Sequence, residues 1–324
     1  MRVMALTCAA LAVIALAYLV RRWLVADRLS RPERHQLSLT PRDFDLAFQR
    51  VEFQSVEDSL SLRGWWMPSS GSQQSVILVH GRNSNRSGFD SKDGSDGDLL
   101  RQAAGLVDRG YTVLSFDLRG HGESAGKRYS LGPHESLDVL GAVAYVRGRG
   151  DAGDKIFLLC HSMGAATCLL AAPKTMDVAA IVADSGYAEL TDLLLVELPR
   201  ASGLPDFFNP GILWMGKLLY GIDVSSAAPI RSVGEIEAPV LLIHSESDTI
   251  VPFDHSLRLW RTLGQTPDTL WLVNGPPHNR VFESDPETYL ERITNFYQAA
   301  TLIWPCRARF FKNVENHSRS PIWR

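Results

Sequence analysis

A serine in a sharp polar turn is the first residue of this chain whose surroundings suggest chemistry. Residues 155–170 read KIFLLCHSMGAATCLL, so an apolar run typical of a buried strand ends near Ser162 and a second apolar run follows at once. In a strand–turn–helix unit of the form small-x-Ser-x-Gly, the serine projects from the carboxyl end of the strand, and its neighbours are small because the turn is tight. Gly164 fits this form, and Cys160, which stands where glycine is usual, is also small. Ser162 is therefore the candidate nucleophile.

A serine hydroxyl needs a base that takes its proton and a carboxylate that orients the base. On an α/β sheet these groups follow the serine in the order acid, then histidine. Asp248 comes just after the apolar run PVLLIHS, and His278 comes just after the next run, TLWLV. We therefore predict that Ser162, Asp248 and His278 meet at one edge of the sheet. Asp184, at the end of an earlier run, is the alternative acid, and His161 is expected to pack behind the turn.

Attack on a carbonyl also needs backbone N–H groups that stabilise the negative charge developing on oxygen. The amide after the nucleophile, that of Met163, is the first expected donor. The second should come from the loop after VILVH, where Gly81 lets the backbone approach the site closely. Arg82 is the predicted second donor of this oxyanion hole, and Asn83 is the alternative.

Six short apolar runs and one hairpin pattern supply the elements that would position these residues. The hairpin pattern is RVEFQSV followed, after a short polar turn, by LSLRGWWMP. The apolar runs do not alternate with polar residues, which is typical of parallel strands covered by helices; they are residues 75–80, 111–116, 155–160, 179–184, 239–245 and 269–273. We predict an α/β fold with a mostly parallel central sheet, helices on both faces, and a small lid of two amphipathic helices between about 188 and 236.

Five segments in their usual order give the chain a resemblance to a known family. They are VILVHGRN, SFDLRGHGES, CHSMG, SESDTIVP and PPHNR. Over roughly residues 50–300 the chain resembles the serine-hydrolase branch of the α/β-hydrolase superfamily, and it is most similar to membrane-anchored esterases, lipases and peptidase-like members. The resemblance implies the α/β-hydrolase fold, with residues 117–124 shaping the loop beneath the site. Gly120-x-Gly122 in that segment imitates a dinucleotide-binding fingerprint, but no helical pattern opens directly after it.

The resemblance and the residues together imply acyl transfer through an acyl-enzyme intermediate. Carboxylic esters, including lipid or acyl esters, are the expected substrates of such a carboxylesterase-like or lipase-like enzyme. A serine peptidase or a thioesterase is the alternative, because the same triad cleaves amides and thioesters. A non-catalytic α/β-hydrolase scaffold is the alternative of a different class, and it would predict a broken triad. No metal ion and no organic cofactor is expected.

Residues 1–24 form an apolar segment without a charged residue from Val3 to Val20, close to the length of a membrane-spanning helix. We expect an uncleaved membrane anchor or signal-anchor. A cleaved signal peptide is the alternative, because residues 15–17 (Ala-Leu-Ala) offer a small-x-small site. Arginines are denser after the apolar run than before it, so the positive-inside rule slightly favours a cytoplasmic catalytic domain; they are Arg2 on one side and Arg21, Arg22, Arg28, Arg31 and Arg34 on the other.

The rest of the chain divides into three segments. Residues 25–48 are predicted to be a linker, residues 49–300 the hydrolase domain, and residues 301–324 a basic, loosely ordered C-terminal tail. The stretch over residues 82–100 is rich in Gly, Ser, Asn and Asp, and we expect an exposed loop before a helix. A calcium site is the alternative there, through Asp90, Asp93, Asp96 and Asp98.

Composition restricts the partners and the compartment. A formal net charge of -3 gives no electrostatic case for binding nucleic acid, so no nucleic-acid partner is expected. The four cysteines show no metal-binding spacing, and disulfide bonds are not expected; they are Cys8, Cys160, Cys168 and Cys306. The cysteine pattern therefore favours a reducing compartment.

Overall fold

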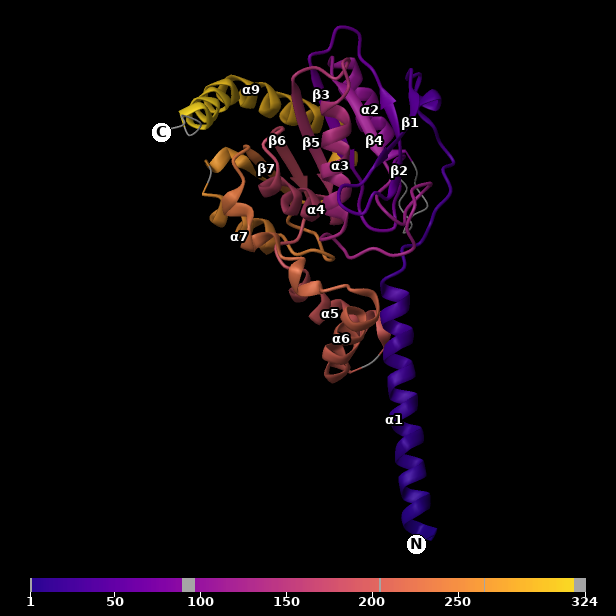
Figure 1. The fold of residues 1–324 in the computed structure, drawn as a ribbon. Helices are drawn as coiled ribbons and strands as arrows, with labels where there is room; N and C mark the ends of the chain where they lie inside the picture. Colours follow the sequence, from indigo (N-terminus) through magenta and orange to yellow (C-terminus); the bar gives the residue numbers. More distant parts are fainter. Residues whose placement is uncertain (1, 89–96, 204, 265, 318–324) are drawn as a thin grey trace, which may run out of the picture.

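The structure, a computed structural model, describes residues 2–88, 97–203, 205–264 and 266–317. Its centre is an eight-stranded sheet with the order β1-β2-β4-β3-β5-β6-β7-β8 (Figure 1). The strands are β1 (Gln49–Gln54), β2 (Ser61–Met67), β3 (Gln74–Val79), β4 (Thr112–Phe116), β5 (Lys155–His161), β6 (Val178–Asp184), β7 (Val240–Ser245) and β8 (Leu270–Val273).

The hairpin and the six parallel strands predicted from the sequence are all present. β1 pairs antiparallel with β2, β2 pairs antiparallel with β4, and the neighbours from β4 to β8 are parallel. The chain passes from β3 outward to β4 and then returns to place β5 on the other side of β3. This reversal opens a crevice outside the carboxyl ends of β3 and β5, which is where ligands bind in open α/β sheets.

Helices cover both faces of the sheet, and each face has its own apolar core. On one face lie α2 (Asp98–Asp108), α8 (Val281–Ser284) and α9 (Pro286–His317). On the other face lie α3 (Glu135–Arg147), α4 (Met163–Ala171) and α7 (Asp254–Leu263). Successive strand residues enter opposite cores, as Ile77 and Leu78 do. The strands therefore read as continuous apolar runs.

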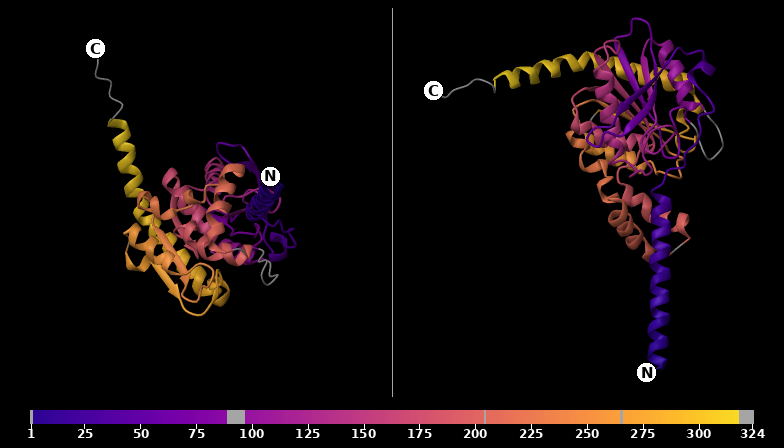
Figure 2. Two further views of the ribbon diagram at one scale, coloured as in Figure 1. Left: turned by 90° about the horizontal axis from the view of Figure 1, so that it is seen from below. Right: turned by 45° about the vertical axis from the view of Figure 1, so that its right-hand side comes forward.

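Two helices between β6 and β7 form the predicted lid segment, α5 (Leu190–Ser202) and α6 (Asn209–Tyr220). They lie beside the N-terminal helix α1 (Arg2–Leu29), which projects away from the sheet (Figures 1 and 2). α1 is apolar and long enough to cross a membrane, and its apolar stretch is not buried against the rest of the described chain. Such a helix could be a membrane anchor or a signal sequence.

Both terminal helices are longer than the sequence indicates. α1 continues to Leu29, inside the predicted linker, because its last turns pack on the lid. α9 continues to His317, so the part of the predicted tail up to that residue is helical rather than loosely ordered, while residues 318–324 lie outside the described residues. The remaining short elements are 3₁₀ helices at Pro41–Phe44, Ala172–Lys174, Asp206–Phe208, Val224–Ser226, Pro229–Arg231, Val233–Glu235 and Pro267–Thr269.

Candidate active site

The three side chains singled out in the sequence meet at the carboxyl edge of the sheet. Ser162 Oγ lies 2.8 Å from His278 Nε2, and His278 Nδ1 lies 2.6 Å from Asp248 Oδ2. The carboxylate accepts from Nδ1, so Nδ1 carries the imidazole proton and Nε2 accepts from the serine hydroxyl. In this arrangement the imidazole is oriented to take the serine proton.

The turn that presents Ser162 is strained in the way a nucleophile turn requires. Ser162 has φ 53° and ψ −118°, a left-handed conformation that non-glycine residues rarely adopt. Its backbone N–H is held by the carbonyl of Asp184, 2.8 Å away. Gly164 cannot be larger, because a Cβ there would lie 2.5 Å from the carbonyl oxygen of His80. Helix α4 can therefore start directly against β3, and the serine stays in the crevice.

Asp248 is held by backbone donors on one side and by histidines on the other. Its Oδ1 accepts from the N–H groups of Ile250 at 2.8 Å and Val251 at 2.9 Å. Burial raises the pKa of Asp248, but hydrogen bonds from His244 and His278 outweigh burial and bring this pKa well below its usual value. The carboxylate is therefore ionised across the neutral range, as a group that orients an imidazole must be.

His244 is a site residue that the sequence analysis assigned only to a strand. It lies at the end of β7, fully buried, with Nε2 3.2 Å from Asp248 Oδ2 and 2.8 Å from the carbonyl of Val251. Nε2 faces two acceptors and so carries the proton, while Nδ1 accepts from the Ser256 hydroxyl at 2.6 Å. His244 thus donates to the same carboxylate oxygen as His278 and helps to fix the orientation of the carboxylate. The i,i+4 spacing of His244 and Asp248 around the strand end was the available signal.

We expect His244→Leu to lower kcat for ester hydrolysis by about 10- to 100-fold, because a hydrogen bond to a charged group is worth about 1.5–3 kcal/mol and about 1.4 kcal/mol is a tenfold rate change. His244→Gln keeps an N–H donor and should recover part of the rate. Steady-state kinetics of the two variants test this role. Equal rates for His244→Leu and the unaltered protein would contradict it.

Two buried histidines hold the loop that is expected to supply the second oxyanion donor. The Leu118 amide donates to His80 Nε2 at 3.0 Å, so His80 Nδ1 donates to the carbonyl of Gly81 at 2.7 Å. The Asn83 amide donates to His121 Nε2 at 3.3 Å. Burial lowers the pKa of His80 to about 4, which keeps this ring neutral and able to accept.

The loop geometry separates the two candidates for that donor. The Asn83 amide is engaged by His121, whereas Arg82 lines the same cavity as Ser162. The Arg82 side chain is held by its Nε, which donates to the Tyr129 hydroxyl at 2.8 Å. Met163 begins α4, and the first N–H groups of a helix have no acceptor within it. This favours the Met163 and Arg82 amides over that of Asn83.

The alternative acid and the histidine beside the nucleophile lie behind the turn. Asp184 accepts from the Ser185 and Tyr289 hydroxyls at 2.8 and 3.0 Å, whereas His278 bonds Asp248. His161 is buried as predicted, and its Nδ1 lies 3.1 Å from Oδ1 of Asn279. His161 therefore links the nucleophile turn to the loop that carries the candidate base.

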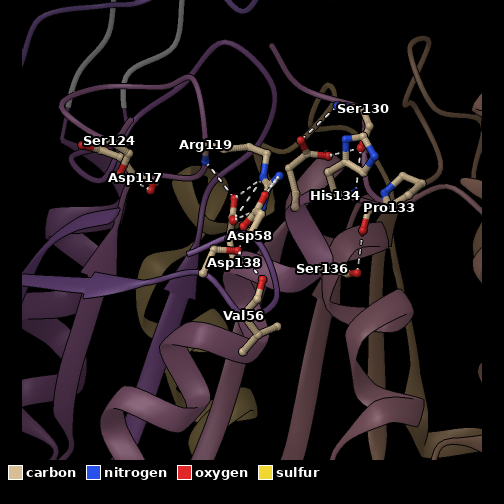
Figure 3. Close-up of polar contacts among 12 residues, drawn as sticks. Val56, Asp58, Asp117, Arg119, Ser124, Ser130, Pro133, His134, Ser136 and Asp138 are labelled. Carbon is tan, nitrogen blue, oxygen red and sulfur yellow. Dashed lines mark hydrogen bonds and ion pairs between the residues drawn. The ribbon is translucent and has the colours of Figure 1, made fainter. Parts of the chain in front are cut away.

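The DLRGHGES segment serves as scaffold, as the resemblance implied. The Arg119 guanidinium donates to Asp138 in α3 and to Asp58 after β1, which clamps the loop to both elements (Figure 3). Burial raises the pKa of Asp138 to about 6, against the opposing effect of its hydrogen bonds from Arg119. Gly120 and Gly122 lie in turns, and the next helix begins only at Glu135. The segment therefore lacks the helix N-terminus that a dinucleotide site needs.

The expectation of no disulfide bonds is wrong. Cys160 at the end of β5 is joined to Cys168 in α4, and both residues are fully buried. The two cysteines are eight residues apart, but the strand reverses into the helix at Ser162 and brings their Cα atoms to 6.5 Å. The bond ties together the two elements that flank the nucleophile. Cys8 is a free, exposed cysteine.

A cavity of about 120 Å³ opens beside Ser162 and His278. Its wall combines apolar side chains such as Leu99 and Phe282 with the polar Gln102 and Glu283. Burial and the neighbouring Asp98 carboxylate raise the pKa of Glu283 to about 7. The space next to the nucleophile is therefore small and partly polar.

Within residues 2–88, 97–203, 205–264 and 266–317, no group of three or more His, Cys, Asp or Glu side chains could hold a metal ion. Of the aspartates in the calcium alternative, Asp90, Asp93 and Asp96 lie outside the described residues. Asp98 begins α2, so a helix follows the stretch as expected, and Asp98 Oδ2 lies 3.1 Å from Arg280. The expected exposure is wrong for Asn85, Arg86 and Ser87, which are buried. The absence of a metal ion and a cofactor stays a prediction.

Comparison with known proteins establishes the class. A model of the alpha/beta hydrolase family matches residues 76–293, and the chain therefore belongs to the α/β-hydrolase superfamily. Among solved structures it is similar to the Pyrococcus furiosus esterase Pf2001, with a TM-score of 0.66 and 25% identity over 83% of this chain and 98% of the esterase.

Similar sequences include both bacterial and vertebrate proteins. Bacillus subtilis YqkD is 26% identical over 238 residues, which cover 72% of this chain and 74% of YqkD. The lysophosphatidylserine lipase ABHD12 of Danio rerio is 26% identical over 213 residues, which cover 62% of this chain and 50% of the lipase. The family and these likenesses support hydrolase activity.

Proposed function

We propose that this protein is a serine hydrolase that cleaves carboxylic esters with Ser162 as nucleophile, His278 as base and Asp248 as the group that orients the base. The observation that carries this proposal is the continuous hydrogen-bonded series from the serine hydroxyl through the imidazole to the carboxylate, with contacts of 2.8 and 2.6 Å. An intact series disfavours a non-catalytic scaffold. No step of the proposed reaction requires a metal ion or an organic cofactor.

The reaction proceeds in two acyl-transfer steps. His278 Nε2 takes the proton of Ser162 Oγ as this oxygen attacks the ester carbonyl. The carbonyl oxygen becomes negative and accepts from the amides of Met163 and Arg82, the proposed oxyanion hole. His278 then gives the proton to the departing alcohol, which leaves an acyl-enzyme. Water then attacks the acyl-enzyme with His278 as base, which releases the carboxylic acid and returns the proton to Ser162 Oγ.

The cavity beside Ser162 supports esters of short acyl groups as the preferred substrates. We expect kcat/KM for p-nitrophenyl acetate and butyrate to exceed that for laurate and palmitate, because a cavity of about 120 Å³ can surround only a short acyl group and the rest of a long chain would extend into solvent. A screen of p-nitrophenyl esters of graded length, with aminoacyl amides and an acyl thioester beside them, measures this preference. Faster cleavage of amides or thioesters than of every ester would favour the peptidase or thioesterase alternative.

Similarity to the zebrafish lysophosphatidylserine lipase supports a second candidate, an ester bond within a lipid. A lysophospholipid belongs in the same screen, presented in mixed micelles. If the protein hydrolyses the lysophospholipid faster than every short ester, a lipid ester is the better candidate for the substrate.

We propose that α1 anchors the protein in a membrane, with the catalytic domain in an oxidising compartment. Disulfide bonds persist in exported compartments and are rare in the cytosol, so the Cys160–Cys168 bond favours a catalytic domain outside the cytoplasm. The arginine distribution favours the cytoplasmic side instead. In bacterial cells, a C-terminal alkaline phosphatase fusion should be active and a C-terminal GFP fusion dark. A bright GFP fusion with an inactive phosphatase fusion would contradict this orientation.

A further inference from the structure

Exposed large hydrophobic side chains are concentrated on two neighbouring parts of the molecule. Among the described residues there are 18 such side chains, of which eleven lie on α1 and two, Met176 and Leu302, lie elsewhere. The other five belong to the lid: Leu195, Phe207, Trp214, Leu218 and Leu219. Single exposed hydrophobic residues are ordinary on a soluble surface, but a concentration on one element indicates an interaction surface.

On α6 the apolar residues form one broad stripe that is only partly buried. Trp214 and Leu218 are one helical turn apart, 57% and 61% exposed. Gly211, Ile212 and Met215 are buried, Ile212 and Met215 in a small core that also contains Ala26 of α1. α6 therefore holds α1 with the buried part of this stripe, while Trp214 and Leu218 continue the stripe without a covering element in the described chain.

The lid is fixed to the carboxyl-terminal half of α1 by several contacts. The rings of Tyr18 and Phe208 lie 4.8 Å apart, and Asp27 accepts from the Tyr220 hydroxyl at 2.8 Å. A Cβ at Gly211 would overlap the guanidinium group of Arg22, so this glycine permits the close approach of α6 to α1. The lid therefore keeps a defined position along the anchor helix.

That position sets the depth of the lid relative to a membrane. The apolar run from Val3 to Val20 is about 27 Å long at 1.5 Å per residue, close to the thickness of about 30 Å of a bilayer's hydrocarbon core. Arg22 follows the run, and its guanidinium lies 3.8 Å from the Tyr18 ring centroid and 6.0 Å from that of Phe208. Phe208 is thus level with the end of the apolar run, where headgroup phosphates would meet the arginines.

We propose that the lid is seated in the surface of the bilayer beside α1, with Phe207, Trp214 and Leu218 at the boundary between headgroups and acyl chains. Aromatic side chains favour this boundary, and apolar helix faces bury themselves there. The continuity of the lid surface with a membrane-spanning helix makes lipid the occupant. The inference rests on membrane anchorage through α1, and it does not depend on catalysis by Ser162.

Depth-dependent quenching in full-length protein tests this proposal. In a background of Cys8→Ala and Cys306→Ala, single cysteines are introduced as Phe207→Cys, Leu218→Cys or Met176→Cys and labelled with the environment-sensitive fluorophore NBD. Met176 is the matched control, because it is 51% exposed and lies just before the amino end of β6, whereas the lid follows the carboxyl end of that strand. A fourth sample retains Cys8, labelled within α1, and reports anchorage directly. Each is placed at one copy per phospholipid nanodisc, and thermal melting confirms that each variant is folded.

With lipids that carry a nitroxide near the headgroup, the labels at positions 207 and 218 should lose most of their fluorescence and show blue-shifted emission. The label at position 176 should keep its intensity and its aqueous spectrum. Equal, water-like spectra at all three positions would overturn the proposal. A blue shift at positions 207 and 218 without nitroxide quenching would also overturn the proposal, because these residues would then be covered by protein rather than by lipid. Absence of quenching at the Cys8 label would show that α1 is not in the bilayer, and the inference, which rests on that anchorage, would fall. None of these readouts requires activity, so they are independent of the proposed function.

Discussion

Replacing Ser162 by alanine is expected to lower kcat for p-nitrophenyl butyrate by on the order of 10⁵-fold, because removal of the nucleophile of a Ser-His-Asp triad leaves only binding and oxyanion stabilisation. The Ser162 side chain makes one contact of consequence, with His278 Nε2 at 2.8 Å. Alanine at this position keeps the strained turn and changes no packed apolar surface. Substrate binding and thermal stability should therefore stay near their original values while turnover is lost.

Ser84→Ala is the matched control, since Ser84 lines the same cavity and is not part of the proposed triad. Its kcat should stay within a few-fold of the unaltered protein. Retention of a tenth or more of the activity by Ser162→Ala would mean that another group attacks the ester. An equal loss in both variants would mean that the cavity, rather than the nucleophile, is being disturbed.

Asp248→Asn is expected to lower kcat by about 10⁴-fold while the fold persists, because the amide can reverse the tautomer of the imidazole. An asparagine NH₂ group facing His278 Nδ1 makes this nitrogen an acceptor and moves the proton to Nε2. His278 then cannot take the proton of Ser162. The remaining amide oxygen can still accept from Ile250 and Val251, whose N–H groups now bond Oδ1 at 2.8 and 2.9 Å.

The same variant should change the acid stability in a direction set by the lowered pKa of Asp248. A carboxyl whose pKa is lower in the folded state stabilises above its unfolded pKa of about 3.9, and this contribution is lost as the pH falls toward the folded value. The stability advantage of the unaltered protein over Asp248→Asn should therefore be complete at neutral pH and shrink below about pH 4. Asp254→Asn, an exposed residue at the start of α7, is the control and should change neither kcat nor this dependence.

The meeting of Ser162, Asp248 and His278 was predictable because each residue follows a short apolar run, and parallel strands bring such positions to one edge. The β1–β2 hairpin and the six parallel strands were predictable for a similar reason, since buried strands are read directly from continuous Val, Ile and Leu. The strand order was not predictable, because the local sequence of the connection from β3 to β4 does not show on which side of β3 the strand β4 will pair.

Features that depend on contacts across elements escaped the sequence. His244 looks like any residue of a buried strand, and only the turn after β7 folds Asp248 back onto its ring. Cys160 and Cys168 show no framework spacing, and only the reversal at Ser162 brings them together. The last turn of α1 has a polar composition that reads as a linker, but Asp27 bonds Arg128 and Tyr220 and so extends the helix onto the lid.

Covalent capture by a fluorophosphonate probe tests the central claim most directly, because the probe reacts with a serine only when a neighbouring base activates its hydroxyl. The intact protein should take up one probe molecule, and peptide mass spectrometry should place the adduct on Ser162, with labelling abolished by His278→Ala. An unlabelled protein, or an adduct on a different serine, would contradict the account.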